Sequence, residues 1–396
     1  MSGTARPAPS ARLPALLARV HALGKEIIAP ASAAVDRDAR FPSEAFTALK
    51  AEKLLSCYVP EAYGGMGLSI TDLSKICEAL GLYCGSTAMV FAMHQIQVGC
   101  VVHHALGSPF FQQYVRDLVA HQYLMASATT ELGIGGDVRT STCAVIREGD
   151  RFSLEKQAPV ISYGEAADCI LVTARRAPDA GPNDQVHVLV NKADCTLEPL
   201  SSWDTLGFRG TCSLGFVLRA KGPVEQILPV PYAEIHAKTM HPFSHGVWAS
   251  LWLGIATDSV QMARNFVRAA ARKTPGQLPP SALRLAEVDG TLFTFRSSVE
   301  NTVAEYHQRL IDCPEGPFPT DFGFAIRVNN LKVMSSELLV DVVGRSMLIC
   351  GIAGYRNDSK HSLGRHLRDA YGAALMVNND RILGQSSTMQ IVQREG

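Results

Sequence analysis

The 396-residue sequence predicts an α+β protein in which helical regions lie before and after a central β-domain. Three observations predict this fold class. Apolar residues recur at spacings of three and four over residues 13–122, the spacing shortens and turn formers appear over 123–237, and long helical patterns return over 238–396. We therefore expect an N-terminal α-helical domain, a middle β-barrel or β-sandwich domain and a C-terminal four-helix bundle over these ranges.

The N-terminal region has further features beside its helical spacing. Residues 1–12 are rich in Ala, Pro, Ser and Arg and lack the continuous apolar core of a signal peptide, so we expect a disordered lead-in. The Gly-rich run Tyr63–Gly67 predicts a turn within the helical layer. The most apolar stretch, Ala88–Leu106, carries several His and Gln side chains. It is too polar for a membrane span and predicts a buried helix.

Short apolar segments between turn formers predict the middle domain. Cys143–Ile146 and Arg151–Leu154 flank a polar turn at Arg147–Asp150, which indicates a hairpin. Further strands are expected at Cys169–Thr173, Val186–Val190 and Ser213–Leu218. In the C-terminal region, helices long enough for a bundle are expected at Trp248–Ala271, Leu283–Leu310, Phe322–Cys350 and Ser362–Val377.

The composition excludes several classes of function. Lys plus Arg and Asp plus Glu both number 37, so no net field would attract nucleic acid or an anionic membrane, and small-molecule or protein-borne substrates are favoured. The ten cysteines form no C-x-x-C pair, which indicates reduced thiols in a cytoplasmic protein. Hydrolase, P-loop and Rossmann fingerprints are absent from the sequence.

Histidines are the one group that suggests a metal. His94, His103, His104, His241 and His245 have no carboxylate or thiol beside them at ligand spacing, and adjacent histidines on a helix point apart. We therefore expect no metal site.

An ordered set of motifs carries the functional information. It consists of Pro60–Gly67, Ser127–Asp137, Ile161–Asp168, Leu206–Gly210, Gly351–Tyr355 and the pair Arg368-Asp369. In this order and spacing, the set resembles the acyl-CoA dehydrogenase family over nearly the whole chain. That family folds as an α-domain, a β-domain and a four-helix bundle, which is the order the spacing of apolar residues predicts.

The resemblance implies FAD as the cofactor. Groups around Ser127 and Thr130 would then contact the pyrimidine edge of the flavin, and Ser162 would form a hydrogen bond near its N5 atom. Gly135 and Gly136 would allow the chain to approach the cofactor closely. The alternative is that the hydroxyl groups only end strands and that the glycines form a plain turn.

Two further cofactor residues are implied in the C-terminal region. Arg272 with Gly276 matches the family's Arg-x-x-Phe-Gly, whose Arg reaches the flavin diphosphate of a neighbouring subunit, so a homodimer or homotetramer is expected. Gly351 matches a glycine near the adenosine half of the cofactor. The alternatives are a surface arginine at a helix end and a helix C-cap.

The chain also departs from the family pattern. Gly136 replaces the usual Ser, Glu155–Val160 replaces Asn-Gly-x-Lys-x-Trp, Leu348 replaces a Gln and Pro275 replaces the Phe after Arg272. These changes put a diphosphate contact and the cover over the flavin ring in doubt. They are typical of a divergent, biosynthetic member of the family.

The catalytic base is the largest departure. Val377 stands where most members carry a Glu, and Ser244 stands where a minority place it on the first bundle helix. The nearest carboxylate is Asp380, which a loop shift of three residues would bring over the substrate. The alternative roles of Asp380 are an N-cap or a partner for Arg381.

These observations lead to three hypotheses about function. The first is an FAD-dependent α,β-dehydrogenase of an acyl thioester, acyl-CoA or acyl-carrier protein, with an electron acceptor flavoprotein or oxygen as oxidant. The second is a flavin-dependent monooxygenase on the same fold, which needs no Glu at position 377. The third is a catalytically silent scaffold that binds acyl chains or partner proteins.

Overall fold

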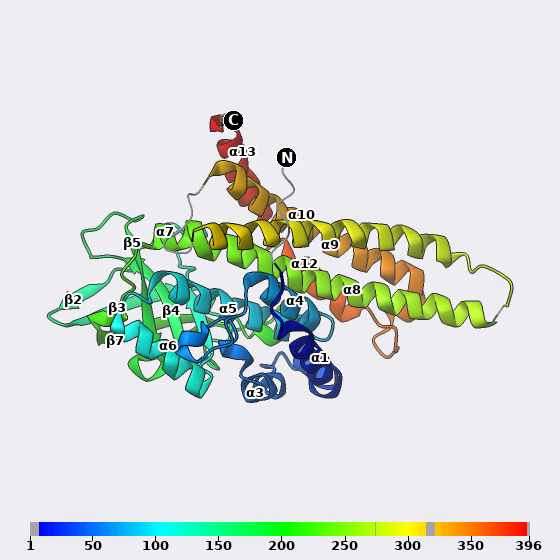
Figure 1. Ribbon diagram of the computed structural model, residues 1–396, viewed down its shortest axis with the longest axis horizontal. Helices are drawn as coiled ribbons and strands as arrows, with labels where there is room; N and C mark the ends of the chain where they lie inside the picture. Colours follow the sequence, from blue (N-terminus) through cyan, green and yellow to red (C-terminus); the bar gives the residue numbers. More distant parts are fainter. Residues whose placement is uncertain (1–7, 274, 314–320, 394–396) are drawn as a thin grey trace.

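The computed structural model describes residues 8–273, 275–313 and 321–393. Figure 1 shows an elongated molecule with its strands gathered at one end and the long helices α8, α9 and α10 running lengthwise away from them. The predicted order of a helical region, a β-region and a second helical region is confirmed. Most of the predicted lead-in over residues 1–12 lies outside the described residues.

Among the described residues, six α-helices form the N-terminal region. They are α1 (Leu13–Leu23), α2 (Ala29–Arg37), α3 (Ser43–Ala51), α4 (Ile70–Gly81), α5 (Gly85–His104) and α6 (Pro109–His121). Local sequence sets some of their ends: Ser69 and Asp72 form a reciprocal capping box at the start of α4, and Gly64 adopts a positive φ of 88° in the predicted Gly-rich turn. The predicted buried helix is α5, which is covered along almost its entire length.

Seven strands form two sheets within the part of the chain that the structure describes. They are β1 (Met125–Ala128), β2 (Ile146–Glu148), β3 (Arg151–Ala158), β4 (Cys169–Arg175), β5 (Gln185–Asn191), β6 (Cys195–Ser201) and β7 (Gly215–Pro223). One sheet has the order β1-β4-β5, with β1 parallel to β4, and the other is antiparallel with the order β2-β3-β7-β6. The β3 strand alternates between buried and exposed side chains, as expected of a sheet with one face toward a core.

The predicted hairpin is present, but its first strand begins at Ile146 and not at Cys143. The preceding residues pair with the end of β4: the Val145 N–H donates to the Arg175 carbonyl at 2.9 Å, and the Arg175 N–H donates to the Cys143 carbonyl at 2.8 Å. The backbone of residues 143–145 is therefore occupied by β4 and is not available to β3.

The C-terminal region contains three long helices and several short ones. Its α-helices are α7 (Tyr232–Ile235), α8 (His241–Lys273), α9 (Ser281–Asp312), α10 (Phe322–Cys350), α11 (Ile352–Tyr355), α12 (Gly364–Ala373) and α13 (Asn379–Val392). A π-helical turn, His236–Met240, joins α7 to α8.

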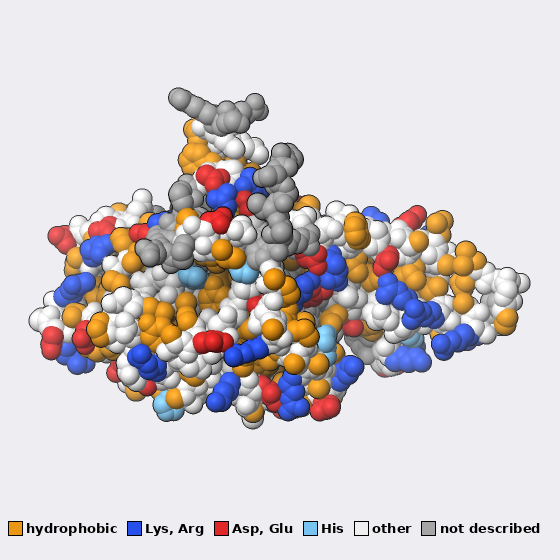
Figure 2. Space-filling model, in the orientation of Figure 1, with side chains coloured by type: hydrophobic (Ala, Val, Ile, Leu, Met, Phe, Trp, Pro, Cys, Tyr) orange, Lys and Arg blue, Asp and Glu red, His pale blue; other side chains and the backbone are white. Residues whose placement is uncertain are grey.

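The ten cysteines all lie within the described residues, and none forms a disulfide there. Figure 2 shows cationic and anionic side chains interspersed over the face in view.

The fourth predicted bundle helix is shorter than expected. It ends at Ala373 instead of Val377, because the backbone of Val377 adopts a φ of 45°, which is unfavourable for a β-branched residue. The Lys332 ammonium group holds this turn by donating to the Val377 carbonyl at 2.9 Å and to Asn379 Oδ1 at 2.7 Å. The chain then enters α13, whose N-cap is Asn378.

A buried histidine connects the N-terminal helices to the strand that begins the β-region. His94 Nε2 donates to the Leu55 carbonyl at 2.7 Å, and His94 Nδ1 accepts from the Met125 N–H at 3.0 Å. Both ring nitrogens are therefore satisfied in the neutral imidazole. Burial lowers the pKa of His94 to about 4, so the folded protein holds this ring neutral well below pH 6.5.

We predict that His94 makes the protein less stable in acid. The unfolded chain takes up the proton below about pH 6.5 and the folded chain only near pH 4, so stability is lost as the pH falls between these values. From pH 7 to pH 5 the loss from this residue is about 2 kcal/mol. Urea unfolding at the two pH values should show a smaller loss for His94→Gln than for the native protein. The exposed His121, changed to Gln, is the control, and an equal pH slope in the His94 variant would contradict the account.

Candidate functional site

A cavity of about 580 Å³ opens where the three regions of the fold meet. Its walls come from α5, the end of β1, the loop 129–139, the start of α8 with the preceding π-helical turn, and the segment from α12 to α13. The wall contributed by α5 is largely apolar and includes Met89, Met93 and Ile96. Segments far apart in the sequence therefore combine into one site.

The three hydroxyl residues expected to contact a flavin all line this cavity. Thr130 Oγ1 donates to the Val160 carbonyl at 3.0 Å, which fixes the end of the β1 segment against the next loop. Ser162 Oγ accepts from Ser213 Oγ at 2.8 Å. The proton of the Ser162 hydroxyl has no acceptor within the described part of the chain, so it is free to be donated to a group in the cavity.

These residues fit a flavin. The pyrimidine edge and the N5 atom of an isoalloxazine ring accept hydrogen bonds, and hydroxyl groups on the cavity wall at Ser127 and Ser162 can donate them. The glycine-rich loop beside them has Gly133, Gly135 and Gly136 at positive φ values of 88°, 58° and 80°. A backbone without Cβ atoms at these points allows a flat ligand to approach closely.

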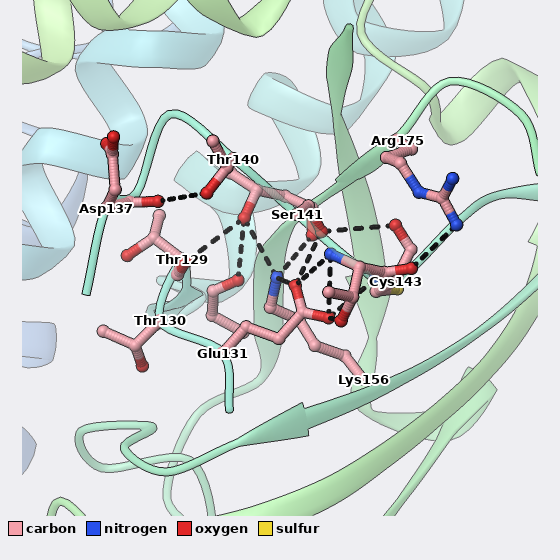
Figure 3. Close-up of polar contacts among 12 residues, drawn as sticks. Thr129, Thr130, Glu131, Asp137, Thr140, Ser141, Cys143, Lys156 and Arg175 are labelled. Carbon is pink, nitrogen blue, oxygen red and sulfur yellow. Dashed lines mark hydrogen bonds and ion pairs between the residues drawn. The ribbon is translucent and has the colours of Figure 1, made fainter. Parts of the chain in front are cut away.

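A buried ion pair lies beneath this loop, as Figure 3 shows. Lys156 Nζ lies 3.1 Å from Glu131 Oε2, and both side chains are almost fully buried. Glu131 also accepts from Ser141 Oγ at 2.6 Å and from the Cys143 N–H at 2.6 Å. Lys156 in turn donates to the Thr173 carbonyl at 2.8 Å. One carboxylate thus joins both ends of the loop 131–143 to strands β3 and β4.

The surroundings keep the Glu131 carboxylate ionised. Burial on its own would raise the pKa of Glu131, but the Lys156 ammonium and the hydroxyl groups of Ser141 and Thr142 outweigh burial and lower it. Buried charges are tolerated when each has a partner and further hydrogen bonds, as here. The sequence showed Glu155–Val160 only as a departure from the family motif, and it gave no signal that Lys156 pairs with Glu131.

The structure places the predicted base, Asp380, outside the cavity lining. Asp380 is exposed in the first turn of α13, where its own N–H donates to Asn378 Oδ1 at 2.8 Å. Its neighbours Val377 and Arg381 do line the cavity, because the turn directs them inward and Asp380 outward. The geometry therefore does not support Asp380 as the base.

Three histidines that sequence reasoning considered only as metal ligands, or not at all, line the cavity instead. They are His236, His241 and His245. His241 Nε2 lies 2.7 Å from Asn329 Oδ1, and Asn329 Nδ2 donates to Ser386 Oγ at 3.0 Å. The i, i+4 spacing of His241 and His245 indicated a shared helix face, but nothing local indicated that Asn329 would orient one ring.

Arg272 and Gly351 lie away from this cavity. Arg272 is exposed in the last turn of α8, at the end of the bundle opposite the strands in Figure 1. Gly351 ends α10 with a φ of 58°, and its N–H donates to the Met347 carbonyl at 2.9 Å, as in a C-cap. Their predicted contacts with a flavin would need a second subunit and stay predictions.

Two kinds of feature are absent from the described residues, a metal-binding cluster and a membrane-spanning helix. No group of three or more His, Cys, Asp or Glu side chains in the described ranges could hold a metal ion. Within the same ranges, no helix combines the length and apolarity needed to cross a membrane.

We predict that the substitution Glu131→Gln lowers the free energy of unfolding and weakens flavin binding. The substitution leaves Lys156 buried without a counter-charge, which costs about 3–5 kcal/mol in comparable cases. Urea unfolding measures the loss of stability, and flavin fluorescence quenching measures the dissociation constant.

The control for this prediction is the double variant Glu131→Gln, Lys156→Met, which removes both charges. It should recover much of the stability that the single variant loses, because no uncompensated charge then remains buried. A single variant as stable as the native protein would show that the ion pair does not hold the loop.

Comparison with known proteins extends these observations. The family model for the acyl-CoA dehydrogenase N-terminal domain matches residues 11–122. The probable acyl-CoA dehydrogenase fadE25 of Mycobacterium leprae is 30% identical over 360 residues, which cover 90% of this chain and 89% of that protein. Cyclohex-1-ene-1-carbonyl-CoA dehydrogenase of Geobacter metallireducens is 29% identical over 204 residues, 51% of this chain and only 53% of that relative.

Solved structures show the same fold. Butyryl-CoA dehydrogenase from Megasphaera elsdenii has a TM-score of 0.82 at 19% identity, over 98% of this chain and 100% of that one. The FMN-bound TdsC from Paenibacillus sp. A11-2 also has a TM-score of 0.82, at 17% identity, over 96% of this chain and 98% of that one. The similarity to fadE25 extends over all three regions of the fold. The chain therefore belongs to the acyl-CoA dehydrogenase family of flavin-dependent oxidoreductases, with FAD as the cofactor typical of that family.

Proposed function

We propose that the chain catalyses FAD-dependent α,β-dehydrogenation of an acyl thioester, with CoA or a carrier protein as the thiol. The observation that carries the proposal is a single cavity. It is lined by the hydroxyl groups proposed to contact the flavin, by the apolar wall from α5, and by the histidines described above. An electron acceptor flavoprotein, or oxygen, would reoxidise the cofactor. A homodimer or homotetramer in the cytoplasm belongs to the same proposal.

The apolar wall suits an acyl chain. Met89, Met93 and Ile96 of α5 face the start of α8, where Trp248 also lines the cavity. Methionine side chains adapt to ligands of varied form, because they are unbranched and polarizable. The acyl group would lie between α5 and α8, with its thioester carbonyl near the hydroxyl groups of Ser127 and Ser162.

His241 is the proposed proton acceptor in place of the missing carboxylate. Asn329 directs its amide nitrogen to Ser386, so its Oδ1 faces His241 and the ring proton resides on Nε2. Nδ1 of the neutral ring then keeps a lone pair, and it has no donor within the described part of the chain. Burial lowers the pKa of His241, which keeps the ring neutral and able to accept the α-proton at neutral pH. When bound, the flavin would accept the β-hydride.

The proposed reaction predicts that an acyl thioester reduces the bound flavin without oxygen. An anaerobic absorbance titration of the FAD-loaded protein, with straight, branched and carrier-linked acyl thioesters, should bleach the oxidised flavin band with at least one of them. A flavin that stays oxidised with every thioester would contradict the proposal, and a protein that binds no flavin would favour the scaffold hypothesis.

Replacing His241 should slow flavin reduction more than it weakens substrate binding. His241→Gln can keep a hydrogen bond with Asn329 but cannot accept a proton, so rapid-mixing measurements should show a loss of about 10²–10⁴ in the reduction rate. Because the pKa of His241 is lowered, the native rate should stay level as the pH falls through 6.5 and decline only at more acid pH.

His307→Gln is the matched control, because His307 bonds a hydroxyl group, Thr71 Oγ1, at 2.8 Å but does not line the cavity. It should reduce flavin at the native rate. A His241 variant that is as fast as this control would remove His241 from the proposed mechanism.

A flavin-dependent monooxygenase is the second candidate. Val377 occupies the position of the usual Glu, and Asp137, the only carboxylate among the described cavity residues, is bound to Arg139 at 3.1 Å. TdsC, a dibenzothiophene monooxygenase, has the same fold. Oxygen consumption with a flavin reductase and an acyl-free aromatic or amine substrate would support this candidate, provided that the thioesters fail to bleach the flavin.

A further inference from the structure

We propose that Arg381 is a phosphate-binding residue for the flavin nucleotide, and that Gly136 is the residue whose missing side chain makes room for it. Neither the resemblance nor the comparisons assign a role to Arg381. The inference depends on the flavin cofactor but not on the proposed reaction, so it stands if dehydrogenation is not observed.

The guanidinium of Arg381 lies directly on the glycine-rich loop. Arg381 is half-buried in the first turn of α13, lines the cavity and donates through Nη2 to the Gly135 carbonyl. Its Nη1 is buried and has no acceptor within the described residues. Burying a charged donor without an acceptor costs free energy of folding. A ligand that supplies an acceptor here would remove that cost.

The charges around the cavity indicate an anion. Three arginines line it within the described part of the chain, and two of them have carboxylate partners. Arg139 bonds Asp137 at 3.1 Å, and Arg368 bonds Asp36 at 2.9 Å. No such ion pair with Arg381 is present among the described residues. The remaining positive charge suits a phosphate, which a guanidinium can bind through two parallel hydrogen bonds.

The loop adds donors to the same place. Residues 132–136 form a run of turns in which Gly133, Gly135 and Gly136 have positive φ values. Consecutive N–H groups in a loop with positive φ values form a concave surface that favours anions. Arg381 and this loop can therefore bind one phosphate group from two sides.

Gly136 and Arg381 depend on each other sterically. A Cβ atom added at Gly136 would lie 3.0 Å from Nη1 and 3.3 Å from Cζ of Arg381, which is closer than ordinary van der Waals contact. Gly136 is also the position where the family pattern has a Ser, and the loss of that hydroxyl left a diphosphate contact in doubt. Arg381 occupies the space of the missing side chain and would replace its contact.

The phosphate could belong to the flavin or to the nucleotide part of a CoA thioester. We assign it to the flavin because the loop that Arg381 touches continues directly from Thr130, and because Ser127 and Ser162 line the same cavity. The experiment therefore measures both ligands separately.

The test compares flavin binding by Arg381→Gln and by the native protein after removal of flavin. FAD should bind the variant about 10- to 100-fold more weakly, which corresponds to the loss of a charge-assisted contact. Riboflavin, which carries no phosphate, should bind both proteins within about threefold. Arg345→Gln, which removes an exposed arginine paired with Asp341 on α10, is the matched control and should bind FAD normally.

Several outcomes would overturn the proposal. These are an unchanged FAD affinity, an equal loss for FAD and riboflavin, or weaker binding of an acyl-CoA to the FAD-loaded protein with FAD affinity unchanged. If Arg381→Gln does not fold, Arg381→Lys replaces it in the test. Lysine keeps the charge but lacks the two-pronged donor, so an intermediate loss for FAD alone is expected, and no loss would overturn the proposal.

A double variant tests the dependence on Gly136. Gly136→Ser alone should weaken FAD binding, since the new side chain displaces the guanidinium and the φ of 80° at this position disfavours any side chain. In the double variant with Arg381→Gln, the serine hydroxyl can enter the space that the guanidinium leaves. The double variant should therefore lose less FAD affinity than the sum of the two single losses. Additive losses in the double variant would contradict the steric link.

Discussion

The buried contact between Glu131 and Lys156 is the constraint on which the geometry of the site depends. It connects the start of the glycine-rich loop to strand β3, and through Thr173 to strand β4. The same carboxylate accepts from Ser141 and Cys143 at the other end of the loop. A loop with several glycines would otherwise be mobile, and a fixed loop is required if its backbone is to approach a flat cofactor.

Several elements then assemble around this loop. Arg381 approaches it from α13 and contacts the Gly135 carbonyl, and Lys332 holds the unusual backbone of Val377 just before that helix. On the opposite side, His241 is oriented by Asn329 of α10 and Ser386 of α13. Helix α13 thus contributes to two walls of the same cavity, through Arg381 directly and through Ser386, which bonds Asn329. An unfavourable φ at Val377 is retained where the cavity needs this turn.

The sequence predicted the fold well because its evidence is local. Periodic apolar residues mark helices such as α1 and α3, and short runs between turn formers mark strands such as β4 and β5. The hairpin strand was placed too early because its first residues pair with Arg175, and pairing between distant segments leaves no local pattern. The last bundle helix was drawn too long for a similar reason, since Lys332 stabilises the turn that ends it.

The site could be predicted only in part. Ser127, Thr130 and Ser162 belong to motifs whose order is visible in the sequence, and they do line the cavity. Asp380 was chosen by counting along the chain, but the helical phase of α13 directs its side chain to solvent. The sequence suggests His241 only as a metal ligand, because Asn329, which bonds its ring, lies 88 residues away. The expected ligand of Arg272 would lie in a second subunit, so its role stays a prediction.

The most direct test of this account is a crystal structure of the protein grown with FAD. We expect the isoalloxazine ring beside Ser127 and Ser162, the diphosphate between the glycine-rich loop and Arg381, and the Glu131–Lys156 pair unchanged beneath it. Flavin density elsewhere in the molecule, or a loop that leaves Glu131 when the cofactor binds, would contradict the claim that this buried pair prepares the site.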